Sequence, residues 1–147
     1  MPEIRRDWLI SLIKVEIKTL KDNISSENWL NWALQEVSAL GNLPEDFKGP
    51  KTNPPDAKTC KIAKNVIYEL YKFRMKPDRI FASADESIVI SFLGEGKYAD
   101  IECFYDGAIV AIIDNYEVKE YKIWETDSLP IKLKLTFETI RDFMNFY

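Results

Sequence analysis

The chain has 147 residues, of which 46% are hydrophobic, and its formal net charge is −4. This length is that of one ordinary domain, and the apolar content is enough for a core. The net negative charge argues against a surface dominated by nucleic-acid binding, because phosphate contacts require a concentrated excess of Lys and Arg. The sequence contains no histidine, so Ser-His-Asp and Cys-His mechanisms are excluded within this chain.

The two cysteines, Cys60 and Cys103, form neither a disulfide framework nor the spacing of a zinc site. Charged residues interrupt the N-terminal segment, which therefore lacks the apolar region of a signal peptide. No apolar run reaches the ~18 residues that a membrane span requires. We therefore expect a soluble, cytoplasmic protein without a membrane partner.

Apolar residues recur at helical spacing from residue 3 to about residue 23, which predicts an amphipathic helix. Ser25, Ser26 and Glu27 have the pattern of a break followed by a new N-cap. A second helix is expected to follow and to end at Gly41. Residues 1–42 are therefore predicted to form a helical pair.

Residues 43–58 contain four prolines and no apolar period, which is typical of an ordered or mobile loop. A domain linker is the alternative, but the 42 residues before it are few for an independent core. We expect a single α+β domain over residues 1–147. Asp56 or Thr59 is placed to cap a third helix, which Pro77 ends.

Residues 87–113 contain three short runs rich in β-branched and aromatic residues, separated by glycine-bearing turns. This pattern predicts an antiparallel β-meander. Residues 80–84 are expected to form a leading strand and residues 118–124 a fifth strand. A helix over residues 129–147, capped by Ser128 with Pro130 in its first turn, closes the chain. The predicted fold is an α+β sheet of about five strands packed with the N-terminal helices, the helix before the sheet and the C-terminal helix.

Turn geometry assigns the side chains of the meander to two faces. A two-residue turn at Asp106 and Gly107 would place Phe104 opposite Ile109, and the preceding hairpin would place Ile90 opposite Ile101. The face expected to form the core is entirely apolar and comprises Ile88, Ile90, Phe92, Ala99, Ile101, Cys103, Ala108, Val110 and Ile112. The opposite face is mixed and comprises Val89, Ser91, Leu93, Tyr98, Asp100, Glu102, Phe104, Ile109, Ala111 and Ile113.

The mixed face carries less charge than a solvated face normally does, so we expect something to cover part of it. The N-terminal helices are the simplest cover, and a second copy of the chain, another protein or a ligand are the alternatives. The candidate interaction or cation face is formed by Tyr98, Asp100, Glu102, Phe104 and Ile109.

Asp100 and Glu102 lie two residues apart in a strand, so their side chains point to the same face. Paired carboxylates can bind a divalent cation or divide acid and base roles, and Asp85 lies near the other end of the meander. The simpler interpretation is a pair of solvated polar positions. Cys60, near a helix N-terminus, is the one candidate nucleophile, although a structural role is simpler. No catalytic residue, metal or cofactor is assigned.

From about residue 40 onward the chain resembles a widespread group of small uncharacterised bacterial α+β proteins. The resemblance covers roughly two thirds of the chain and is carried by Glu45-Asp46-Phe47-Lys48-Gly49, Asn53-Pro54-Pro55, the helix over 57–70, Pro77-Asp78-Arg79-Ile80, Ala82-Ser83-Ala84-Asp85 and Tyr105-Asp106-Gly107. In that group the turn after the leading strand usually carries glycine, whereas this chain has Asp85-Glu86-Ser87. The resemblance implies the fold and a bacterial or phage origin, and it brings no activity.

Three functions remain open from the sequence. The leading hypothesis is a non-catalytic interaction or accessory module that contacts another protein or a second copy of itself as a homodimer. The first alternative is a small cation-dependent hydrolase that uses Asp100, Glu102 and Asp85. The second is a small-ligand sensor with a pocket lined by Trp or Tyr.

Overall fold

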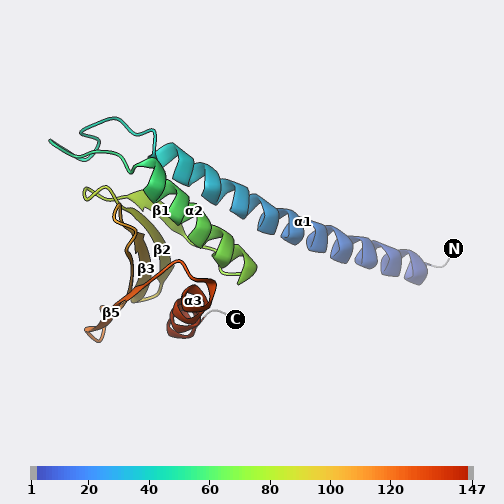
Figure 1. The fold of residues 1–147 in the computed structure, drawn as a ribbon. Helices are drawn as coiled ribbons and strands as arrows, with labels where there is room; N and C mark the ends of the chain where they lie inside the picture. Colours follow the sequence, from blue (N-terminus) through green and yellow to red (C-terminus); the bar gives the residue numbers. More distant parts are fainter. Residues whose placement is uncertain (1–2, 146–147) are drawn as a thin grey trace. The chain divides into compact units, whose positions relative to one another are not determined.

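The computed structural model describes residues 3–145, and within the first helix it describes the side chains of residues 9–14, 17 and 29–40. The elements are α1 (Glu3–Leu40), α2 (Ala57–Lys72), β1 (Arg79–Ala82), β2 (Ile88–Gly94), β3 (Lys97–Cys103), β4 (Ile109–Asn115), β5 (Glu120–Thr126) and α3 (Pro130–Met144). Helices and an antiparallel sheet in this order confirm the predicted α+β class (Figure 1).

The chain divides into two compact units, Met1–Trp32 and Ala33–Tyr147. The second unit contains the last turns of α1, the whole sheet, α2 and α3. The predicted helical pair is wrong, because α1 continues without a break through Ser25 and Ser26. Serine inside a helix costs only about 0.5 kcal/mol relative to alanine. The hydrogen bonds gained when the helix continues can offset this cost. The expected stop is confirmed, since α1 ends at Leu40, directly before Gly41.

Helix α2 begins at Ala57, and its N-cap is Asp56, one of the two predicted candidates. The Asp56 carboxylate accepts a hydrogen bond from the Thr59 backbone N–H at 2.8 Å. The helix ends at Lys72, before it reaches Pro77, the residue that was expected to end it. The left-handed residue Arg74, with φ of 60°, closes the helix, and the next N–H, that of Met75, donates to Leu70 O at 3.0 Å.

The five strands form one antiparallel sheet in the order β1-β2-β3-β4-β5. The predicted register of the β2–β3 hairpin is confirmed, with Ile90 opposite Ile101 and Leu93 opposite Tyr98. The fifth strand lies two residues further along the chain than the predicted 118–124.

The β3–β4 register differs from the prediction by one residue. Cys103, and not Phe104, lies opposite Ile109. The connecting turn is longer than expected: the Phe104 N–H donates to Ala108 O at 2.9 Å, and Gly107 adopts φ of 90°. An extra residue with positive φ is the signature of a bulged hairpin turn.

A shift of one residue moves every side chain of a strand to the opposite face. Ile109 and Ala111 are therefore fully buried in the core, whereas the predicted core residues Val110 and Ile112 lie on the other face.

Helices α2 and α3 cover the same face of the sheet (Figure 1). Their buried residues, among them Leu70 of α2 and Phe137 of α3, pack on the apolar side chains of the strands. The N-cap of α3 is Leu129 with no side-chain hydrogen bond, so the predicted cap at Ser128 is wrong. Pro130 occupies the first turn as expected, and residues 146–147 of the predicted helix lie outside the described residues. The core thus lies between the sheet and these two helices.

Candidate functional site

The second face of the sheet points away from α2 and α3, and we refer to it as the outer face. Strand alternation and the observed registers assign to it Arg79, Phe81, Val89, Ser91, Leu93, Tyr98, Asp100, Glu102, Val110, Ile112, Asp114, Tyr121, Ile123 and Glu125. It combines exposed apolar residues with charged residues, so the predicted mixed character holds for this corrected set.

Two serine–carboxylate pairs lie on or beside the outer face. The fully buried Ser91 hydroxyl donates to Oδ1 of the half-buried Asp100. The fully buried Ser87 hydroxyl donates to Oε2 of Glu102 at 2.9 Å, and its oxygen lies 2.5 Å from that of Ser83. Both carboxylates therefore already hold a hydrogen-bond donor from the protein.

The surroundings of these carboxylates favour their protonated forms. Burial raises the pKa of Asp100, against the lowering effects of the Ser91 hydrogen bond and the Arg79 charge. Burial also raises the pKa of Glu102; the Ser87 hydrogen bond opposes this rise, whereas the charges of Asp85 and Asp100 add to it. A carboxyl with a raised pKa keeps its proton up to a higher pH, so it is available as a general acid closer to neutral pH.

The structure brings three of the five predicted site residues together. Tyr98, Asp100 and Glu102 share the outer face, and burial followed by the Asp114 carboxylate raises the pKa of Tyr98. Phe104 lies in the turn beyond β3. Placing Ile109 on this face was wrong, because the longer turn directs it into the core.

The surroundings of Cys60 differ from those of a nucleophile. Burial raises the pKa of the Cys60 thiol, the reverse of what a nucleophile needs, and its Sγ lies 3.8 Å from Val37 O. Burial also raises the pKa of Cys103, to about 12. Within residues 3–145, the described side chains include no cluster of three or more His, Cys, Asp or Glu residues suited to a metal ion.

The loop before α2 covers the β1 corner of the outer face. Lys48 Nζ and the Arg79 guanidinium lie 5.5 Å and 5.1 Å from the centre of the Phe81 ring. Asn53 Nδ2 donates to Glu86 Oε1 at 2.9 Å. The proline-rich loop thus covers part of the outer face in the unit from residue 33 onward. The N-terminal helices were expected to provide this cover.

The other side of the sheet ends at β5, whose outer edge pairs with no strand of the described residues. On the outer face, 71% of Tyr121 and 55% of Ile123 are exposed. The structure therefore presents a seven-residue edge strand with a partly apolar face.

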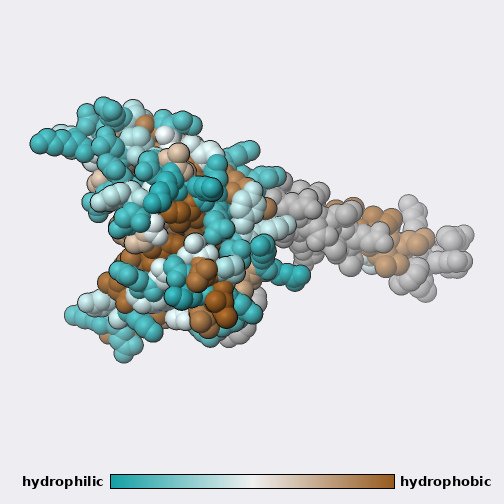
Figure 2. All heavy atoms as spheres, in the orientation of Figure 1, coloured by the Kyte–Doolittle hydropathy of each residue, from teal (hydrophilic) through white to brown (hydrophobic). Residues whose placement is uncertain are grey.

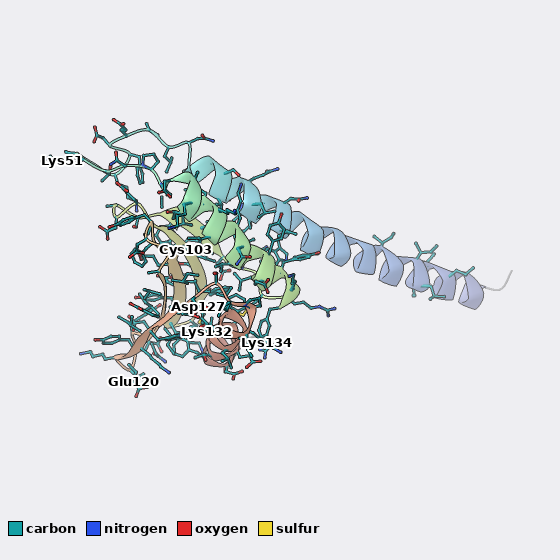
Figure 3. The ribbon with its side chains drawn as sticks, in the orientation of Figure 1. Lys51, Cys103, Glu120, Asp127, Lys132 and Lys134 are labelled. Atoms are coloured by element: carbon teal, nitrogen blue, oxygen red, sulfur yellow. The ribbon has the colours of Figure 1, made fainter. Side chains whose placement is uncertain are left out.

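A groove of about 560 Å³ lies on the other side of this edge, between β5 and α3. It is lined by Lys122, Trp124, Glu125, Thr126, Asp127, Lys132, Leu135, Thr136 and Thr139. Trp124 is held in place by its Nε1–H, which donates to Thr136 Oγ1 at 3.2 Å. Two of these lining residues, Asp127 and Lys132, form an ion pair of 2.9 Å (Figure 3). We call β5 together with this groove the β5 edge. The alternation of residues 118–124 indicated a strand, but no sequence signal showed that it would lie at the edge of the sheet.

None of the described helices has both the length and the apolar character that crossing a bilayer requires. Comparisons with protein-family models, with curated proteins and with solved structures found no match to this chain.

Proposed function

We propose that this protein is a non-catalytic interaction or accessory module of a bacterial or phage system, and that it binds another protein through the β5 edge. The observation that carries this proposal is that the outer edge of β5 pairs with no strand among the described residues and has accessible apolar side chains on both sides. Unpaired backbone N–H and C=O groups are a ready template for an added strand.

The side chains on the two sides of β5 indicate what kind of segment this edge would bind. An extended segment paired with β5 would place alternate side chains beside Tyr121 and Ile123 and the others in the groove beside Trp124 and Leu135. Both sides offer apolar contacts at their centre, so the expected partner is an extended segment with apolar residues on both of its faces. The mixed charges of the groove provide its polar rim.

The opposite edge of the sheet is less suited to strand addition. β1 has four residues, against seven in β5. The loop side chain of Lys48 also lies over the Phe81 ring of β1. Short strands and covering loops are devices by which proteins prevent edge pairing, and β5 lacks a comparable loop among the described residues.

The test is affinity capture from the cell that produces the protein, with quantitative comparison of variants. The double variant Tyr121→Lys and Ile123→Lys is expected to lose its specific partner, because two cations replace the exposed apolar contacts. Tyr105→Lys is the control, since Tyr105 is another exposed aromatic residue (58% exposed, against 71% for Tyr121) and lies in the β3–β4 turn. A partner that the double variant retains would contradict the proposal.

A cation-dependent hydrolase remains the second candidate, and the observation that favours it is that the Asp100 and Glu102 carboxyl groups lie two residues apart on the same face of β3. Titration calorimetry of the free protein with Mg²⁺, Mn²⁺ and Ca²⁺ tests it. Binding that is abolished by Asp100→Ala with Glu102→Ala would support this candidate, whereas no heat of binding from any of the three ions would count against it.

A further inference from the structure

The N-terminal half of α1 exposes apolar side chains to solvent. Among its described side chains, Leu9, Ile10, Leu12, Ile13 and Ile17 are all exposed, and they form brown surface along the helix in Figure 2. Single exposed apolar residues are normal, but a contiguous group on one helix marks a contact surface. This surface belongs to the unit of residues 1–32, whereas the β5 edge belongs to the unit of residues 33–147.

The spacing of the apolar residues identifies the kind of contact. Ile10, Ile13, Ile17, Leu20 and Ile24 follow one another at intervals of three, four, three and four residues. These are the a and d positions of a heptad repeat, with Ile10, Ile17 and Ile24 at a. We call these five residues the seam.

Other apolar rows of the helix are shorter than the seam. Leu12 and Val15 are apolar, but Thr19 and Asp22, the next residues on the same side, are polar. A row of apolar a and d positions forms a continuous core with another helix only as far as the row stays apolar. The seam is such a row, whereas the row of Leu12 is not.

The charged residues beside the seam favour pairing with an identical helix in the parallel orientation. Glu16 occupies a g position and Lys21 the e position five residues later, a spacing that brings opposite charges together across a parallel pair of identical helices. An antiparallel pair with the seam aligned would bring Lys14 near Lys21 of the other helix, which is unfavourable.

We propose that the seam binds the same seam of a second copy of this chain, in a parallel, in-register coiled coil. This contact is independent of the strand addition proposed for β5, so either can fail without the other.

Sedimentation velocity of the full chain in a dilution series tests the seam. The unaltered protein is expected to sediment as more than one copy and to dissociate on dilution. Ile13→Lys places a charge at a d position and is expected to weaken association by at least about tenfold. Leu12→Lys, a neighbouring exposed residue outside the seam (41% exposed, against 55% for Ile13), is expected to leave association unchanged. A monomer at every concentration, or equal losses in the two variants, would overturn the proposal.

Disulfide cross-linking tests the direction of the helices. In a parallel pair, two copies of Ile10→Cys lie at the same level and are expected to cross-link on mild oxidation. In an antiparallel pair aligned on the seam they would lie about 21 Å apart along the axis and could not bond. The unaltered protein, with its own Cys60 and Cys103, is the control. Rapid cross-linking that Ile13→Lys abolishes supports the parallel seam; no cross-linking beyond the control overturns it.

A charge exchange provides a test that does not disturb the seam itself. Glu16→Lys or Lys21→Glu alone is expected to weaken association about twofold to fivefold, because like charges then meet across the pair. The double exchange is expected to restore it. Circular dichroism at low concentration verifies that each variant keeps its helix content. If the double exchange did not restore the association that each single change weakens, the pairing of Glu16 with Lys21 would be contradicted.

Discussion

Ser91 lies directly opposite Asp100 on neighbouring strands, and its fully buried hydroxyl donates a hydrogen bond to the Asp100 carboxylate. Because the carboxylate is half-buried, water can replace this donor only in part. The pair therefore affects both the stability of the sheet and the ionisation of the outer face.

Ser91→Ala is expected to destabilise the protein by about 1.5–3 kcal/mol at neutral pH, since hydrogen bonds to charged groups contribute this much. Urea unfolding followed by tryptophan fluorescence measures the loss. The control is the same substitution in an Asp100→Asn background, where the loss should be smaller because no charge is left without its donor. Equal losses in the two backgrounds would show that the hydroxyl does not act through Asp100.

The pH dependence of Asp100 has a definite sign. Its pKa is raised in the folded protein, so its contribution to stability is present below the ordinary carboxyl value, about pH 4, and is lost as pH rises through the folded pKa. Asp100→Asn is therefore expected to be more stable than the unaltered protein at pH 7, with the difference disappearing toward pH 3. Thermal unfolding between these pH values measures it; a variant that is less stable at pH 7 would contradict the cause assigned to the shift.

Asp56 should behave in the opposite way. The backbone N–H of Thr59, followed by its hydroxyl, lowers the pKa of Asp56 at the N-terminus of α2. The stability that the ionised Asp56 carboxylate contributes is present above the ordinary carboxyl pKa. It is lost as the pH falls through the lowered pKa of the folded protein. Asp56→Ala is expected to cost about 1 kcal/mol at pH 7 and less in acid. Chemical denaturation at both pH values checks this; Asp56→Ser, which keeps a capping oxygen, is the control.

Gly107 permits the turn that sets the β3–β4 register. Its φ of 90° is unfavourable for residues with a side chain, although a Cβ there would meet no atom within 4 Å. Gly107→Ala is therefore expected to destabilise the protein by about 1–2 kcal/mol through backbone strain alone. Gly107→Asn should lose less, because asparagine tolerates positive φ better. Equilibrium unfolding of both variants measures this, and an alanine variant as stable as the unaltered protein would refute the strain argument.

The features that the sequence predicted correctly depend on short-range physics. Strand periodicity indicated the meander and the shared face of Tyr98, Asp100 and Glu102, and the short Gly94–Lys97 connection led to the correct β2–β3 register. The cap at Asp56 was also readable, because its partner lies three residues away. These interactions involve neighbours in the chain and leave a local signature.

Tertiary structure decided the rest. The same dipeptide, Asp106-Gly107, suits a two-residue turn and a bulged one, and the bulged turn moved Ile109 into the core. Ser25 and Ser26 suit a cap and a helix interior, and α1 continued through them. The exposed edge of β5 depends on which strand takes the last place in the sheet, and strand order follows from pairing and burial across the whole unit. The sequence by itself thus determined the elements and the periodicity of their faces, whereas the tertiary structure decided which face and which edge remained exposed, because burial is shared by the whole fold.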